Sequence, residues 1–180
     1  MKRILLLSSF LVSCLVTVAQ QYTPSATGSA VTFKIRNLGV NVNGSFTGLT
    51  GTIVFNAASL NSSQFAVSIN AASINTGINA RDNHLRKETY FNTTQYPQIS
   101  FVSTRVTGFN VAGTYFVFGK LTIKNTTKEI SFPFTVTPEE NNLRFKGSFK
   151  LNRRDYGVGG SSITMSDELT VNLDVLAQRK

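Results

Sequence analysis

The segment TGINARDNHLRKETYF, residues 76–91, holds the chain's only histidine and its densest grouping of acidic and basic side chains. His84 beside Asp82 and Glu88 has the residue types of a metal site. On a helix, however, this spacing does not bring all three side chains to one face. A Ser-His-Asp triad is also disfavoured, because no serine of the chain lies in a nucleophile-elbow motif. We therefore expect the His84 imidazole to hydrogen-bond a backbone carbonyl and to pin the segment in place.

Two groups of charged residues, at 81–82 and at 153–155, also have structural explanations. Asp82 is expected to cap the start of a helix, with Arg81 reaching a carbonyl or a carboxylate on the rim of the fold. Arg153, Arg154 and Asp155 follow a predicted strand. They either clamp an anionic headgroup or form a solvated rim, and the solvated rim is favoured.

The glycine-rich stretch GVGG, residues 157–160, is not a phosphate loop, because no helix with a Lys-Ser or Lys-Thr pair follows it. The sequence therefore predicts no catalytic residue, no metal ion and no cofactor. We expect a protein that is not an enzyme.

The segment that contains His84 is also the part of the chain where a helix fits. Asn79 can cap its start, and Asp82 then lies near the positive end of the helix dipole. The helix is predicted to last about two to three turns, because Pro97 favours an extended approach to the next strand. We expect it to be an insertion that closes one mouth of the fold.

The elements that must position these residues are strands, because apolar and polar residues alternate along most of the chain. The alternation predicts eight strands, near residues 31–35, 51–55, 65–69, 99–106, 117–123, 130–136, 143–151 and 169–175.

Short turn signals separate the predicted strands, for example NGS at 43–45 and PEENN at 138–142. Short connections favour antiparallel hairpins. Closure into a barrel removes the exposed edges that an open sheet of this size would have. The predicted fold is therefore all-β, an eight-stranded antiparallel barrel with one short helix inserted between strands.

The N-terminal residues resemble a secretory signal peptide. Lys2 and Arg3 precede an apolar run from residue 4 to about 18, and Ala19 offers a small residue at the cleavage site. We predict a signal peptide over residues 1–19, a single domain over 20–180, and a periplasmic or secreted location. The alternative is a lipid anchor on Cys14, because LVSC at 11–14 resembles a lipobox.

The chain is basic, with a formal net charge of +9. Its cations are scattered singly, as at Lys34, Lys120, Lys124, Lys146 and Lys150, and not in the blocks that favour nucleic-acid binding. On an exported protein they favour contact with anionic membrane surfaces.

Phenylalanine dominates the predicted inward face, and the chain has 14 phenylalanines and no tryptophan. An eight-stranded barrel is either filled by its own side chains or wide enough for one slender ligand. Gly119, Gly147 and Ala71 could leave a channel or could let neighbouring rings interdigitate. The residues leave both alternatives open.

Several blocks of the sequence resemble the YceI-like family of exported lipid-binding domains. They are FKIRNLG, GSFTGLTGTIVFN, VSINAASINTGINARDNHLRKETYFNTTQYPQISFVSTRV and GKLTIKNTTKEISFPF, and the resemblance extends over nearly all of residues 22–178. It implies a lipocalin-like barrel that holds an isoprenoid or fatty chain, with an isoprenoid quinone as one candidate, and no established catalytic residues. Many members have a histidine after the first strand, where Arg36 and Asn37 stand in this chain.

From this resemblance we expect a non-enzymatic carrier, scavenger or sequestering protein for an amphiphilic lipid. The alternative is an interaction or stress-related accessory protein with a filled barrel and a basic exterior. The side chains expected to line the pocket are Phe33, Ile35, Phe55, Phe65, Val67, Ile69, Phe101, Leu121, Ile123, Phe132, Phe134, Phe145, Phe149 and Val171.

Overall fold

The computed structural model describes residues 20–180, which are mostly β-strand. The strands are β1 (Gln21–Pro24), β2 (Ala30–Asn37), β3 (Val40–Phe46), β4 (Thr50–Val54), β5 (Gln64–Asn70), β6 (Gln98–Gly108), β7 (Thr114–Ile123), β8 (Thr126–Glu139), β9 (Asn142–Asn152) and β10 (Met165–Arg179). One α-helix, α1 (Asn79–Leu85), and three short 3-10 turns, η1 (Leu60–Ser62), η2 (Ala71–Ser73) and η3 (Arg153–Tyr156), complete the described part of the chain.

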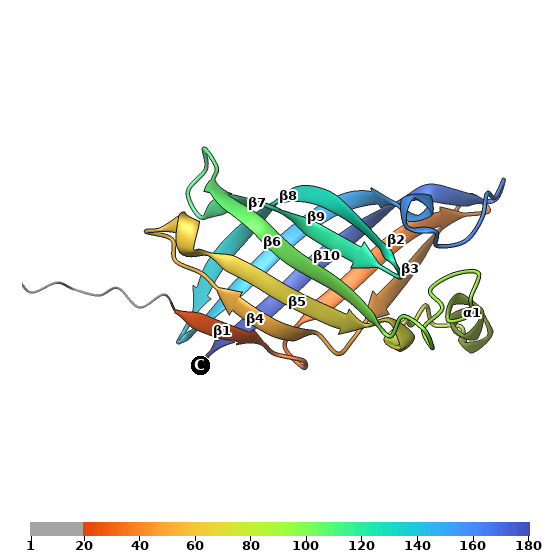
Figure 1. Ribbon diagram of the computed structural model, residues 1–180, viewed down its shortest axis with the longest axis horizontal. Coiled ribbons are helices and arrows are strands. Elements are labelled where there is room, and N and C mark those ends of the chain that lie inside the picture. The colour runs from red at the N-terminus through yellow and green to blue at the C-terminus, as the bar shows by residue number, and fades with distance from the viewer. Residues whose placement is uncertain (1–19) are drawn as a thin grey trace, which may run out of the picture.

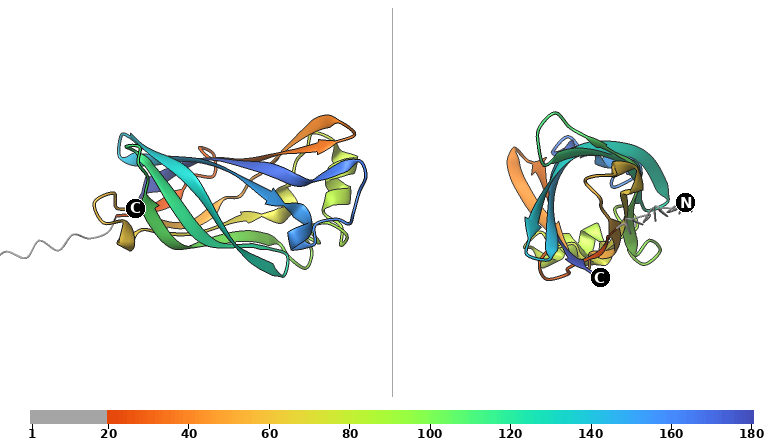
Figure 2. Two further views of the ribbon diagram at one scale, coloured as in Figure 1. Left: turned by 90° about the horizontal axis from the view of Figure 1, so that it is seen from above. Right: turned by 90° about the vertical axis from the view of Figure 1, so that its left-hand side faces the viewer.

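These strands form a closed antiparallel barrel with eight positions around its circumference (Figures 1 and 2). β1 and β2 follow one another along β10, and β4 and β3 follow one another along β1 and β2, so each pair occupies one position. The pairing of β1 with β10 closes the ring. The prediction of an eight-stranded antiparallel barrel with one short helix is confirmed.

The barrel wall has few hydrogen bonds between β3 and the segment that follows β5. A single isolated bridge, Ser45 with Asn75, joins the two here, with backbone distances of 2.9 and 3.0 Å. The Ser73 hydroxyl adds bonds to the backbone of Thr47, and the Asn70 amide donates to the Thr47 carbonyl. By contrast, β9 and β10 are joined by a continuous ladder of ten paired residues, and so are β7 and β8.

The turn expected at residues 43–45 is instead part of β3, and the chain reverses at Leu38 and Gly39. Both turn residues have positive φ, 51° and 77°, as a tight hairpin requires. Gly44 has another purpose in the strand, because the Phe33 ring on β2 covers it. A Cβ atom at Gly44 would lie 2.2 Å from the Phe33 Cζ atom.

Helix α1 lies at one end of the barrel (Figure 1), between β5 and β6 in the chain. Its N-cap residue is Ile78, and Asn79 is the first helical residue, so the prediction that Asn79 caps the helix was wrong. A β-branched aliphatic stands where a side-chain cap is usual, and the preceding loop is held by Asp82 instead. The Asp82 carboxylate accepts hydrogen bonds from the amide and the hydroxyl of Thr76.

Within the described part of the chain, no helix combines the length and the apolar character needed to span a bilayer. The predicted signal peptide and the alternative lipid anchor on Cys14 both lie outside the described residues.

Candidate functional site

The half of the barrel farther from α1 is filled by aromatic rings. Phe55 lies edge-on to Tyr115 and to Phe145, with ring centroids 5.1 and 5.5 Å apart. Phe65 makes similar contacts with Phe134 and Phe145, at 5.5 and 5.6 Å. We call these five residues the aromatic plug. Rings at these distances and angles pack against one another in the interior of this half.

The half nearer α1 is hollow. It contains a cavity of about 220 Å³, which is far larger than the about 10 to 15 Å³ that a single water molecule needs. Eight of the ten strands contribute apolar side chains to the wall, all except β1 and β4, and so does the segment around α1. The sequence left a filled and a hollow barrel open, and each description fits one half of the structure.

Ten of the side chains expected in the pocket do belong to this wall: Phe33, Ile35, Val67, Ile69, Phe101, Leu121, Ile123, Phe132, Phe149 and Val171. The other four, Phe55, Phe65, Phe134 and Phe145, lie in the aromatic plug and not in the cavity wall. The prediction that these four line the cavity is corrected. All four face inward, but they lie on or directly after the stretches of strand that belong to the filled half. Whether the ten bind a ligand stays a prediction.

Glycines explain why rings line the hollow half without crossing it. Phe33 lies over Gly44, and Phe101 lies over Gly119, where a Cβ atom would stand 2.5 Å from the ring. Each ring therefore occupies space beside the neighbouring strand that a side chain would otherwise fill. The rings thus cover the wall and leave the axis open.

The segment around α1 supplies one end of the cavity. Leu85 of the helix and Phe91 beyond it are apolar contributors, and Arg81 and Thr76 are polar ones. The Arg81 guanidinium donates to the Thr76 hydroxyl and carbonyl oxygens, both at 2.7 Å. Arg81 was predicted to reach a carbonyl or a carboxylate, and the structure shows that it reaches the Thr76 carbonyl in the loop before the helix. Asp82, which is 3% exposed, accepts a hydrogen bond from the same threonine.

Arg153 is buried beside the cavity, with 4% of its surface exposed. Its guanidinium donates to the carbonyls of Val158, Gly160 and Ser166 and to the Asp167 carboxylate, at 2.7 to 3.0 Å. Arg153 therefore fixes the loop before β10, and a headgroup clamp is disfavoured because protein acceptors already engage it. Arg154 forms the exposed part of the group, with an ion pair to Asp167 at 3.2 Å.

Asn37 is a wall residue that the sequence did not single out as one. Its Oδ1 atom is buried and has no hydrogen-bond partner within residues 20–180. Burying an amide oxygen without a partner is costly, so the atom suits a hydrogen-bond donor that arrives from outside. Arg36 points away, exposed, with its Nε bonded to the Gly39 carbonyl.

His84 does not take the role expected for it. Its ring is exposed and packs edge-on against Tyr90, with centroids 5.0 Å apart, instead of bonding a barrel carbonyl. An outward position on a short surface helix leaves no carbonyl within its reach. Among the described residues, no group of three His, Cys, Asp or Glu side chains is placed to hold a metal ion.

Comparison with known proteins adds the following. Residues 22–177 match the model of the YceI-like domain. A UPF0312 protein of Pseudomonas savastanoi is 33% identical over 154 residues, which cover 81% of this chain and 77% of that protein.

Two solved structures share the fold. BcnA of Burkholderia cenocepacia superimposes with a TM-score of 0.82 at 23% identity, over 86% of this chain and 99% of that one. A polyisoprenoid binding domain from Saccharophagus degradans superimposes with a TM-score of 0.70 at 17% identity, over 88% and 98%. At these identities the likeness establishes the fold alone.

Proposed function

This chain belongs to the YceI-like family, and on that premise we propose that it is a binding protein that holds one amphiphilic lipid in its barrel. The lipid has an isoprenoid or acyl tail, with an isoprenoid quinone among the candidates. The protein acts outside the cytoplasm as a carrier, scavenger or sequestering protein. The proposal of export is supported by the leader-like residues at 1–19.

The observation that carries this proposal is the apolar cavity enclosed by the barrel. Each methylene-sized group that leaves water for such a wall gains roughly 0.8 kcal/mol. A tail with several isoprenoid or acyl units therefore needs few polar contacts to bind tightly. A similar structure, that of the Saccharophagus degradans domain, is described as polyisoprenoid binding, which supports the same class of ligand.

The few polar groups of the wall favour one orientation of that lipid. Asn37, Thr76 and Arg81 lie at the end near α1, whereas the aromatic plug closes the other end. The tail would therefore point toward the plug and the headgroup toward the helix. Asn37 and Arg81 offer hydrogen bonds to a headgroup, but specificity rests mainly on the tail because the contacts are few.

No residue of the cavity is proposed as catalytic. Arg81 and Arg153 hold loops through hydrogen bonds to protein atoms, and Asp82 holds Thr76. The cavity wall is otherwise almost wholly apolar, which suits binding without chemical change.

The proposal is tested by organic extraction and mass spectrometry of the protein purified from its own host. A bound lipid near one per chain is expected. A Val171→Trp variant, which places an indole in the cavity, should lose most of that lipid, while Asn172→Trp on the outer face of the same strand should retain it. If repeated extractions find no lipid, or if both variants retain it equally, the proposal is wrong.

A further inference from the structure

Three loops at the cavity end of the barrel each expose a large aliphatic side chain (Figure 1). They are Leu38 in the β2–β3 turn, Ile78 before α1, and Ile163 in the loop before β10, with 73%, 52% and 106% of their surfaces exposed. We call these three residues the aliphatic rim. Single exposed aliphatics are common on soluble proteins, but three around one opening indicate a contact surface.

Leu38 is unfavourable in its turn for a second reason. Its φ of 51° is left-handed, and Gly39 follows at 77°, so the pair forms the kind of tight turn in which Asn-Gly is usual. A leucine in this conformation brings its Cβ close to the following carbonyl oxygen, which asparagine tolerates better. A residue that suits neither the backbone nor water is best explained by a partner outside the chain.

The aliphatic rim lies beside the cavity. The Leu38 amide donates to the Thr164 carbonyl at 2.8 Å, which ties the loops of Leu38 and Ile163 together. Asn37 is next to Leu38 in the chain, and Met165 is next to Thr164. These two residues pair between β2 and β10 and belong to the cavity wall.

Ile78 has the same relation to the cavity from the side of the helix. It stands between two wall residues, Thr76 and Arg81. Whatever covers the rim therefore also faces the polar end of the cavity.

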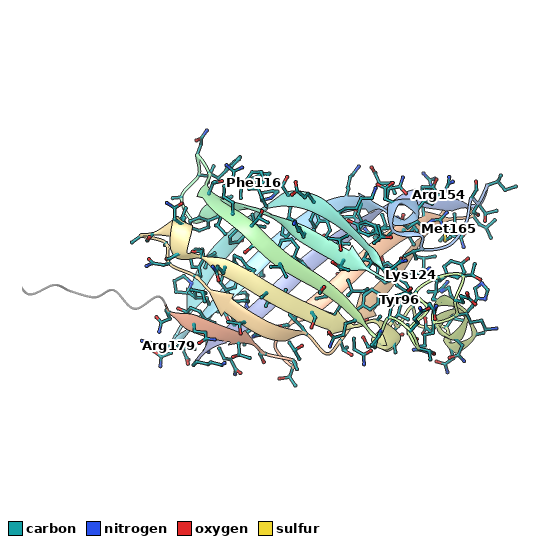
Figure 3. All side chains as sticks on the ribbon, in the orientation of Figure 1. Tyr96, Phe116, Lys124, Arg154, Met165 and Arg179 are labelled. Carbon is teal, nitrogen blue, oxygen red and sulfur yellow. The ribbon has the colours of Figure 1, made fainter. Side chains whose placement is uncertain are left out.

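Charge distinguishes this end from the other. The segments 36–39, 75–91, 124–125 and 152–167 carry seven basic and four acidic residues. Lys124, Arg154 and Met165 lie at this end in Figure 3, away from Phe116 and Arg179. At the far end, loops 55–63 and 109–113 have no charged residue, loop 139–142 has two glutamates, and the C-terminus adds Arg179 and Lys180.

We propose that the aliphatic rim docks on the surface of an anionic lipid bilayer, with its three side chains among the headgroups and the surrounding cations against the lipid phosphates. A bilayer fits both features, because it is flat, negatively charged at its surface and apolar just beneath it. Docking would place the polar end of the cavity directly against the membrane. The inference goes beyond the proposed function but takes from it the reason for that position.

The test is flotation of the purified protein with phosphatidylcholine vesicles that contain or lack phosphatidylglycerol. The protein should float with the anionic vesicles and be released by added salt. A double variant, Leu38→Asn with Ile163→Asn, should lower the partition coefficient about tenfold, because two apolar side chains no longer enter the bilayer. The matched control is Val111→Asn, which removes a side chain that is 58% exposed at the far end and should leave binding unchanged.

Leu38→Asn restores the usual residue of this turn, so loss of the fold is not expected to confuse the result. Equal loss of binding in the Val111→Asn control would overturn the proposal. So would binding that is absent from anionic vesicles in the parent protein. A dimer in sedimentation that disappears in the double variant would assign the rim to a second copy instead.

Bound lipid measured by extraction from the same samples keeps the two proposals apart. The double variant should still hold the cavity lipid, because neither residue belongs to the cavity wall. Vesicle binding without any extractable lipid would refute the carrier function and leave the docking surface standing.

Discussion

The two halves of the barrel use the same residue type for opposite purposes. In the half far from α1, Phe55, Phe134 and Phe145 meet edge to face across the axis and fill it. In the half near α1, Phe33 and Phe101 lie against glycines of the neighbouring strands and line an open cavity. A phenylalanine therefore fills or lines a barrel according to what stands beside it on the neighbouring strand.

This difference predicts that the two halves contribute differently to stability and to lipid binding. The aromatic plug buries large surfaces against one another and should contribute most of the stability. The hollow half has ring contacts along its wall, such as that of Phe132 with Phe149, but it lacks a filled axis and also depends on hydrogen-bonded loops, above all those of Arg153. Substitutions in the two halves should consequently separate stability from lipid content.

The largest expected effect is that of Phe145→Ala in the aromatic plug. Loss of a buried ring and the void it leaves should lower the free energy of unfolding by about 3 to 5 kcal/mol. Urea denaturation measures this, and lipid per folded chain should stay unchanged because the ring is outside the cavity wall. Lipid loss without a loss of stability would mean that Phe145 lines a pocket after all.

Arg153→Met should rank second and should act on the hollow half. Three carbonyls and the Asp167 carboxylate lose their donor, and unpaired buried acceptors cost about 1 to 3 kcal/mol. Hydrogen exchange should show the loop before β10 opening first. Arg154→Met is the control, since its exposed ion pair contributes less than about 1 kcal/mol; similar losses in both variants would contradict the assigned role.

Gly44→Ala tests why the hollow half is hollow. The new methyl group would collide with the Phe33 ring and turn it into the cavity, at a cost of about 1 to 3 kcal/mol. Bound lipid should fall more steeply than the melting temperature. Gly160→Ala is a matched control, because a Cβ atom there meets nothing within 4 Å, and an equal fall in lipid would refute the explanation.

The smallest effect concerns acid stability of the plugged half. The Arg144 guanidinium hydrogen-bonds Glu139 and holds the pKa of that carboxyl below its usual range. Burial raises the pKa of Asp174, but hydrogen bonds from Arg144 and Lys146 outweigh it, so that pKa is also lowered. A carboxyl with a lower pKa in the folded chain stabilises it above the pKa of the unfolded chain, and this contribution is lost as pH falls through the folded value.

Melting temperatures measured from neutral pH down to about pH 2 should therefore separate the native chain from Arg144→Gln. The native chain should have a small advantage near neutral pH that disappears in acid. A constant difference across the whole range would show that Arg144 stabilises through packing and not through these carboxyls.

The fold was predictable because alternation along the strands depends on neighbouring residues only, as in the stretch 143–151. The division into a plug and a cavity was not, because it depends on pairs formed across strands. Gly44 looked like part of a turn, and its relation to Phe33 appears only when β2 and β3 are aligned in register. Inward-facing phenylalanines of both halves look alike in one dimension, which is why the sequence grouped the four of the aromatic plug with those of the cavity wall.

The polar part of the site was predictable by residue type but not by partner. Arg81 stood out in the helical segment and Arg153 after a strand, yet most of their acceptors are backbone carbonyls that no sequence pattern marks. Asn37 followed the end of a predicted strand without any signal of burial. Departure from the histidine found in many family members was the one hint that this position matters.

The isolated bridge between Ser45 and Asn75 leaves a weakly joined seam in the wall of the hollow half. Parting β3 from the chain after β5 breaks a handful of hydrogen bonds, whereas parting β9 from β10 breaks a ladder of ten paired residues. Thermal fluctuations should thus open this seam far more often than the β9–β10 ladder, while the plugged half stays shut. A lipid with a long tail therefore need not enter the barrel through one end, because the wall beside the tail can part lengthwise and close again.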